Sequence, residues 1–280
     1  MRKTIFEILK EKDFNIEEEI LKLEGIFKSE LYSYNVNLED YAQKSFQSWK
    51  HRGMMFSVKE LRKNLDLEHL VNIKRKLPLN EDDLFNYIEF LANMLYLARK
   101  YLEKGRVISD VTNEAFQKTN LILENIDIIS QKFGYKLRFE DEMTFLVKIS
   151  QEATAVAQNY EDIAPDVMEY KRRSLDGNLK RKRELLNHLS NKYEEIENNL
   201  KSNCQTELWT DISFMLNNLK IRHGNLKNNE IVNEYSEKEL EKYYDVCYDC
   251  LLLAFMKNKY LDVKKEIKDL RKKLKTVKES

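Results

Sequence analysis

An arginine and a histidine stand side by side in the stretch NNLKIRHGN, residues 217–225. Arg222 could hold a phosphate through its planar fork of N–H donors, and His223 could move protons near neutral pH. Asn218 and Asn225 could orient the phosphate or the imidazole ring. Such a set would suit metal-independent cleavage of an RNA phosphodiester, with His223 moving protons to or from the ribose 2′-OH or the leaving oxygen.

The same residues also fit an ordinary helix end. Cations in a last helical turn interact favourably with the helix dipole, and glycine suits the left-handed residue that follows. On this interpretation Lys220, Arg222 and His223 close a helix, and Gly224 takes a positive φ. Helix capping does not explain the surplus of asparagine amides, so both interpretations stay open.

A second group of cations lies in KRRSLDGNLKRKR, residues 171–183, which carries seven cations and one carboxylate. A solvated helix face would explain this cluster, and so would a surface that binds RNA phosphates. If the helices run antiparallel, the cluster and Arg222 should share one positive surface. The candidate nucleic-acid contacts are Lys171, Arg172, Arg173, Lys180, Arg181, Lys182, Arg183 and Lys220.

Other chemistry has little local basis in the sequence. Cys247 and Cys250 form a CxxC pair without the two further ligands of a zinc site, so two packed helix cysteines are expected. Phosphate-loop, dinucleotide-binding, zincin and hydrolase-elbow motifs do not occur. The sequence therefore predicts no metal and no cofactor.

Composition limits the class of protein. The 280 residues include 48 basic and 48 acidic side chains, so the net charge predicts no general attraction to nucleic acid. With 42% hydrophobic and 34% charged residues, the chain is too apolar for a disordered protein and too charged for a membrane protein. The charged start and the three cysteines lead us to expect a cytoplasmic protein with no membrane contact.

The elements that must position these residues are predicted to be helices. Apolar residues recur at spacings of three and four, and only six glycines and two prolines interrupt them, which predicts an all-α fold. Asn80 is predicted to cap a helix, Ser57 and Glu60 to form a capping box, and Gly134 to stop a helix. YKLRF, residues 135–139, resembles a strand but is too short to carry a sheet.

Two lobes are expected, with a boundary near Pro165. Residues 1–160 should form a helical N-terminal lobe of unknown role. Residues 161–280 should form an up-and-down bundle with helices over about 175–200, 206–222 and 237–256, followed by a separate C-terminal amphipathic helix.

The last helix shows the a/d spacing of a coiled coil. A helix packed against its own domain would explain this pattern, and a homodimer contact is the alternative. The positions alternate in steps of three and four, and they are Tyr260, Val263, Ile267, Leu270, Leu274 and Val277.

Three segments, SLDGNLKRKRELLNHL, DISFMLNNLKIRHGN and YYDVCYDCLLLAF, resemble bacterial abortive-infection-type proteins and, more loosely, the HEPN superfamily of helical bundles. The resemblance covers about residues 165–257. It implies a HEPN-like bundle, a role in phage defence and an RNA-cleaving site at a dimer interface, with His223 as the family histidine. In the family pattern an arginine is followed by four to six residues and then the histidine, whereas this chain has Asn217 and Asn218 in the region where that arginine would stand.

The sequence is therefore compatible with two functions. One is an RNA-binding or RNA-cleaving protein, and the other is a non-catalytic helical module for protein interaction or regulation. RNA cleavage needs Arg222 and His223 on an open surface beside a cleft. An interaction module would instead bury or ion-pair these residues and would expose an apolar patch.

Overall fold

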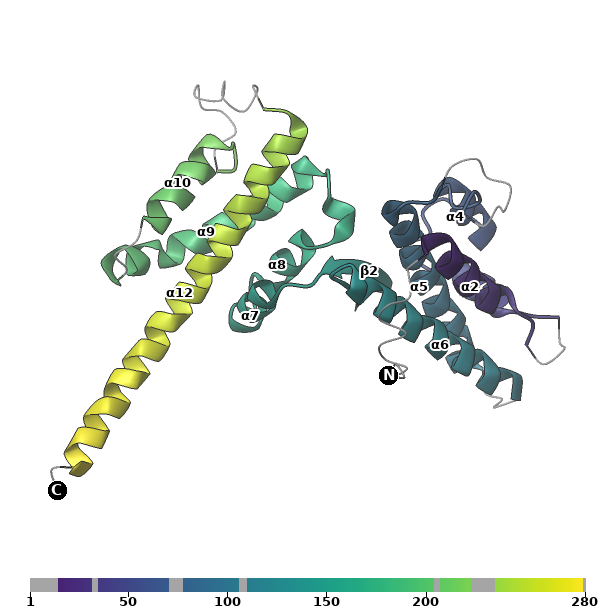
Figure 1. The fold of residues 1–280 in the computed structure, drawn as a ribbon, viewed down its shortest axis with the longest axis horizontal. Helices are drawn as coiled ribbons and strands as arrows, with labels where there is room; N and C mark the ends of the chain where they lie inside the picture. Colours follow the sequence, from purple (N-terminus) through teal and green to yellow (C-terminus); the bar gives the residue numbers. More distant parts are fainter. Residues whose placement is uncertain are drawn as a thin grey trace, which may run out of the picture. The chain divides into compact units, whose positions relative to one another are not determined.

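The structure is a computed structural model, and it describes residues 15–31, 35–70, 78–105, 110–203, 207–222 and 235–278. Helices dominate it and a single hairpin supplies the sheet, which confirms the all-α class (Figure 1). None of the helices in these ranges has an apolar stretch long enough to cross a membrane.

The chain divides into two compact units, Met1–Leu146 and Val147–Ser280. The division falls inside a strand, upstream of the boundary expected at residue 160. Pro165 does not separate lobes, because it occupies the first turn of a helix in the second unit. Proline suits that position, where its missing N–H has no partner within the helix.

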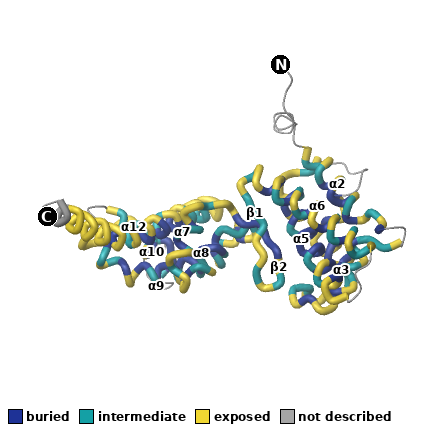
Figure 2. The backbone as a smooth tube through the Cα atoms, turned by 90° about the horizontal axis from the view of Figure 1, so that it is seen from below, coloured by how far each residue is buried: buried dark blue, intermediate teal, exposed yellow. Residues whose placement is uncertain are grey.

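The first unit is built around one long buried helix, α5 (Glu81–Lys104). Asn80 caps it as predicted, with reciprocal bonds to Asp83 of 3.0 and 2.9 Å. Its apolar residues at spacings of three and four are fully buried, and much of α5 is dark blue in Figure 2. They are Leu84, Ile88, Leu91, Leu95 and Ala98. The other elements of this unit are α2 (Ile16–Lys28), α3 (Leu38–Phe46), α4 (Val58–Asn64), α6 (Asp110–Lys132), β1 (Tyr135–Glu140) and β2 (Met143–Lys148).

Two predicted helix boundaries in this unit are confirmed in outline. Gly134 follows α6 with a φ of 76°, the left-handed conformation expected after a helix. Ser57 caps α4 by accepting from the Glu60 amide at 3.1 Å. The reciprocal half of the capping box is absent from Ser57, since Glu60 Oε2 accepts from the Phe56 amide instead, at 2.8 Å.

The expectation that residues 135–139 cannot carry a sheet is wrong, because they pair with β2 in a hairpin. Asp141 and Glu142 form its two-residue turn with φ values of 53° and 63°. Lys50 forms an ion pair with Asp141, and Trp49 Nε1 donates to the Glu142 carbonyl at 2.8 Å. The sequence Asp-Glu does not favour positive φ at both turn positions, so contacts with residues far away in the sequence stabilise this turn.

The outer edge of β2 is satisfied by side chains of α5. Asn93 is buried and bonds both backbone groups of Thr144, at 2.7 and 2.8 Å. Glu89 accepts from the Leu146 amide at 2.8 Å. These bonds replace a third strand, which explains how so small a sheet persists.

The second unit contains α7 (Gln151–Asn159), α8 (Ala164–Tyr170), the short 3₁₀ helix η1 (Arg173–Leu175), α9 (Leu179–Asn203), α10 (Leu208–Asn218) and α12 (Glu237–Lys278). α12 packs on α9, α10 and α7. The prediction of two separate helices after residue 237 is wrong, since α12 is continuous over 42 residues. No glycine or proline occurs within it, and Asn258 stays helical while its side chain bonds Asn199 and Tyr160.

Candidate functional site

The segment after α10 does not have the predicted geometry. α10 ends at Asn218, so the expected helix through Arg222 is wrong. Lys220 takes the left-handed conformation, with a φ of 58°, at the point where the chain turns. Asn218 Nδ2 donates to the Phe214 carbonyl of its own helix at 2.8 Å and does not lie on one helical face with Arg222. His223, Gly224 and Asn225 lie outside the described residues.

The early end of α10 has a packing reason. Leu219 and Ile221 are both buried, although they are only two residues apart, which an extended turn allows and one face of a helix does not. Asn187 Nδ2 of α9 donates to the Ile221 carbonyl at 2.7 Å, and Tyr244 of α12 donates to the Leu219 carbonyl at 3.4 Å. The segment is therefore held by both neighbouring helices.

Arg222 packs against α9. Its Nε lies 3.1 Å from Glu194 Oε1, and its guanidinium lies 5.9 Å from the centre of the Tyr193 ring. Only 12% of its side chain is exposed. Neither its Nε nor its Nη2 makes a hydrogen bond among the described residues. Within the part of the chain that the structure describes, Arg222 is therefore a largely covered cation beside one carboxylate, with guanidinium donors left over.

Three members of the basic cluster are neutralised by carboxylates. Arg181 makes a bidentate pair with Glu169, at 2.7 and 2.9 Å. Lys182 is only 3% exposed, and its Nζ lies 2.9 Å from Glu241 and 2.8 Å from Asp245. The third is Lys171, whose Nζ lies 3.3 Å from Asp249. These contacts join α8, α9 and α12, so the cations act as cross-links within the unit.

The rest of the cluster is mixed. Lys180 is exposed and Arg183 is half-buried, and neither has an ion pair among the described residues. Arg172, Arg173 and Lys220 each interact with other groups. Glu194, which pairs with Arg222, follows Arg183, the last cation of the cluster, by 11 residues on α9, or about 16 Å of helix. The Ile221 carbonyl next to Arg222 bonds Asn187, one turn beyond Arg183, whereas the Arg222 guanidinium lies against Tyr193 and Glu194 further along α9.

The two cysteines of α12 are free thiols in different surroundings. Cys247 is buried, and burial raises the pKa of its thiol to about 12, while Cys250 is half-buried. Within the described ranges, no group of three or more His, Cys, Asp or Glu side chains is placed to hold a metal ion. Cys247 is therefore a core residue of the helix.

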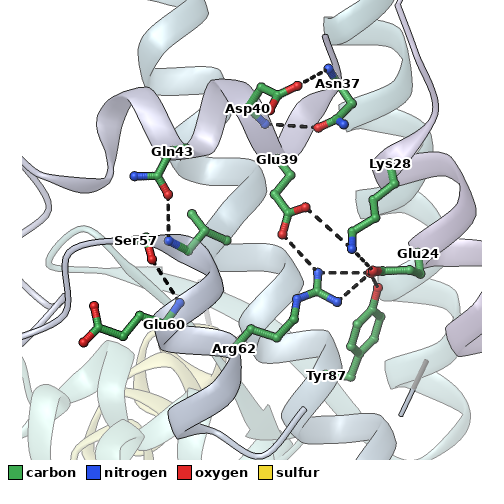
Figure 3. Close-up of polar contacts among 11 residues, drawn as sticks. Glu24, Lys28, Asn37, Glu39, Asp40, Gln43, Ser57, Glu60, Arg62 and Tyr87 are labelled. Carbon is green, nitrogen blue, oxygen red and sulfur yellow. Dashed lines mark hydrogen bonds and ion pairs between the residues drawn. The ribbon is translucent and has the colours of Figure 1, made fainter. Parts of the chain in front are cut away.

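A buried charge network in the first unit was not predicted from the sequence (Figure 3). Arg62 of α4 donates to both carboxylate oxygens of Glu24 in α2, at 2.7 and 3.2 Å. Tyr87 of α5 donates to the same carboxylate at 2.6 Å, and Lys28 lies 3.0 Å from it. Arg62 also lies 3.5 Å from Glu39. Side chains from three helices therefore meet at the Glu24 carboxylate. These residues are far apart in the sequence, and no local pattern predicts that they come together.

The pKa of Glu24 follows from this network. Burial alone raises the pKa, but the hydrogen bonds and charge of Arg62, with bonds from Tyr87 and Lys28, outweigh burial and hold it below the usual range. A carboxyl group whose pKa is lowered by folding stabilises the folded state at pH values above the pKa of an ordinary glutamate. This stabilisation is lost as the pH falls through the pKa of Glu24 in the folded state.

We therefore expect the urea midpoint of the first unit to fall as the pH drops below the ordinary glutamate range. A Glu24→Gln variant should be less stable at neutral pH and should show a shallower pH dependence. Trp49 lies in this unit, so its fluorescence in a Trp209→Phe background can follow the transition. Identical pH profiles for the variant and the parent would contradict the assignment.

A cavity of about 550 Å³ adjoins this network. Its lining balances three cations, Lys28, Lys59 and Arg62, against the acidic Glu39, Asp40 and Glu68. Arg62 and Lys28 are already engaged by carboxylates. The cavity therefore has no electrostatic preference for an anion or for a cation, and we assign it no ligand.

A line of exposed apolar residues runs along α12 in the second unit and is here called the α12 stripe. Its seven residues are 38–57% exposed, and they follow the heptad a/d spacing from the middle of the helix towards its end. Figures 1 and 2 show that this end of α12 extends beyond α9 and α10 and is exposed. The stripe comprises Leu253, Met256, Tyr260, Val263, Ile267, Leu270 and Leu274.

The seam predicted from the sequence runs from Tyr260 to Val277, and the structure extends it by one heptad back to Leu253. The side chain of Val277 lies outside the described ones. The interpretation as a helix packed on its own domain does not hold for this stretch, since every residue from 262 to 274 is exposed. Sequence reasoning also missed the charge around the seam. Residues 257–278 contain ten cations and three carboxylates, a net charge of +7 in a neutral chain. A count of charge in this window would have found it.

Comparison with known proteins gives no family: no family model, no curated protein and no solved structure matches the chain. The HEPN-like identity therefore stays a prediction from the resemblance. The function has to be argued from the geometry of the chain itself.

Proposed function

We propose that this chain is a non-catalytic helical interaction module that binds a partner helix along the α12 stripe. The observation that carries the proposal is the continuous exposed a/d spacing from Leu253 to Leu274. A contiguous exposed apolar surface on a folded protein often marks an interaction site, whereas single exposed apolar residues scattered over the surface do not.

The buried residues on the opposite face of α12 determine which way the stripe faces. Tyr248, Leu251 and Phe255 are buried against the unit, so the helix cannot rotate to hide the stripe without exposing them. Burying a large apolar side chain stabilises a protein by about 1.5–3 kcal/mol, so such a rotation would be strongly unfavourable. The stripe is therefore presented outward by the packing of the unit.

The surroundings of Arg222 favour this function over RNA cleavage. A transition-state clamp needs an arginine that reaches the phosphate, whereas Arg222 is ion-paired with Glu194 and mostly covered. Arg181 and Lys182 are likewise engaged by carboxylates. Among the described residues of the second unit, exposed positive charge that could support RNA binding remains at Lys180 and along the end of α12.

The proposal can be tested with a heptad peptide about four heptads long, with Ile at a, Leu at d and Gln at e and g. Fluorescence anisotropy would be measured at concentrations where the labelled peptide alone is monomeric. We expect the full chain to bind the peptide saturably. A stripe variant, Ile267→Ser with Leu270→Ser, should bind at least about tenfold more weakly, because two seam contacts are lost.

The matched control is Lys265→Ser with Lys268→Ser, which introduces the same residues on the same exposed stretch but off the stripe. It should bind the peptide like the parent. Equal binding by the stripe variant, or no binding of any heptad peptide by the parent, would contradict the proposal. Cleavage of single-stranded RNA by the purified chain in EDTA would restore the ribonuclease hypothesis.

A further inference from the structure

We infer that the partner helix of the α12 stripe carries acidic residues beside its apolar seam, so that α12 forms a mixed pair and not a pair with a second copy of this chain. The inference rests on the proposed function and adds the chemistry of the partner. It follows from which heptad positions hold the charges on α12.

With the stripe residues at a and d, the e positions Lys257, Lys264 and Arg271 are all cations. In the sequence, Lys278 occupies the next e position of the same register. Two of the three g positions, Lys259 and Lys273, are also cations, and Glu266 is the only acidic one. Side chains at e and g lie across from the partner helix and set its identity and orientation.

Pairing of α12 with a second copy would bring like charges together. In a parallel pair each g residue faces the e residue five positions later on the other chain. Lys259 would then face Lys264 and Lys273 would face Lys278, and only Glu266 with Arg271 would attract. An antiparallel pair would oppose the e positions to one another, and all of them are cations. Both arrangements argue against the predicted homodimer through this seam.

The make-up of the stripe favours a helix over a lipid surface. Every residue from 262 to 273 that lies outside the stripe is charged, so the apolar arc is only the a and d positions wide. Helices that lie in a membrane interface carry Trp and Phe as well as Leu on their apolar face, whereas the stripe contains neither Trp nor Phe. One a/d seam is the width that a single partner helix covers, and glutamates at its e and g positions would meet the cations of α12.

The stripe also opens into a hollow at its inner end. Leu253 and Met256 line a cavity of about 530 Å³ together with Ile149 and Leu252. Its other lining residues are polar or charged, and they are Ser150, Glu152, Lys171 and Asp249. Ile149 is itself half exposed, so this hollow adds some apolar surface at one end of the stripe. The surface therefore combines an apolar seam, a cationic border and a hollow of mixed character at one end.

The test uses three heptad peptides that share Ile at a and Leu at d and differ only at e and g, which are Glu, Gln or Lys. A fourth peptide has the composition of the Glu peptide in scrambled order. We expect the full chain to bind the Glu peptide about tenfold more tightly than the Gln peptide, as several surface ion pairs together should give. The Lys and scrambled peptides should not bind, and added salt should narrow the difference between Glu and Gln.

Charge reversal gives the sharper variant. Lys264→Glu with Arg271→Glu should exchange the preference, so that the Lys peptide binds and the Glu peptide does not. Lys265→Glu with Lys272→Glu changes the net charge equally at exposed positions away from the seam, and it should keep the preference of the parent.

The outcomes separate the two proposals. Equal binding of the Gln and Glu peptides would overturn the acidic partner and leave the interaction module intact. Binding of no heptad peptide would overturn both. The acidic helix would also be overturned if the scrambled peptide or single-stranded RNA bound as well as the Glu peptide. The same holds if vesicles of phosphatidylcholine and phosphatidylserine bound through the stripe, or if light scattering gave a dimer at tens of micromolar.

Discussion

Replacing Arg62 with methionine is expected to lower the free energy of unfolding of the first unit by about 3–5 kcal/mol. The guanidinium neutralises Glu24 inside the core and lies 5.0 Å from the centre of the Phe90 ring. Methionine fills a similar volume but removes the positive charge, so the buried Glu24 carboxylate loses its main ion-pair partner. An incompletely neutralised buried charge is the main reason why breaking a buried ion pair is destabilising. Urea unfolding followed by Trp49 fluorescence, in a Trp209→Phe background, would measure the loss.

The double variant Glu24→Leu with Arg62→Met provides the control. If the loss in Arg62→Met comes from an uncompensated charge, removing that charge should recover much of it, because apolar replacement of a whole buried pair is often neutral. A double variant whose loss equals the sum of the single losses would show that the two residues act through packing alone.

Phe255→Ala and Met256→Ala should differ by several kcal/mol although the residues are neighbours on α12. Phe255 is fully buried, and its truncation should destabilise the second unit by about 3–5 kcal/mol. Met256 is 39% exposed on the stripe, and its truncation should stay within about 0.5 kcal/mol. Trp209 fluorescence in a Trp49→Phe background would follow this unit, and similar losses in both variants would contradict the two-faced description of α12.

The parts of the fold that were predictable from sequence are those set by local periodicity and capping. The buried face of α5, its Asn80 cap and the left-handed Gly134 all follow from residues within a few positions of one another. The a/d seam was visible for the same reason, since its spacing is a local pattern. Whether the seam would be covered or exposed depends on the whole unit and could not be predicted.

The remaining features depend on contacts between residues far apart in sequence. The hairpin turn at Asp141 is held by Lys50 and Trp49, and the edge of β2 by Asn93. α10 stops early because α9 and α12 bind the segment that follows it. The surroundings of the candidate cations could not be predicted for the same reason, since the carboxylates that pair with Arg181, Lys182 and Arg222 come from elsewhere in the chain.

The unbroken course of α12 also bears on how its exposed end can be helical at all. An isolated helix shorter than about 12–15 residues is marginal in water, because nucleation fixes several residues before hydrogen bonds compensate. The exposed stretch from 262 onward needs no nucleus of its own, since it propagates from turns anchored by Leu251, Phe255 and Leu261. A partner would therefore meet a preorganised helix, and docking would not have to supply the entropy of folding a disordered tail.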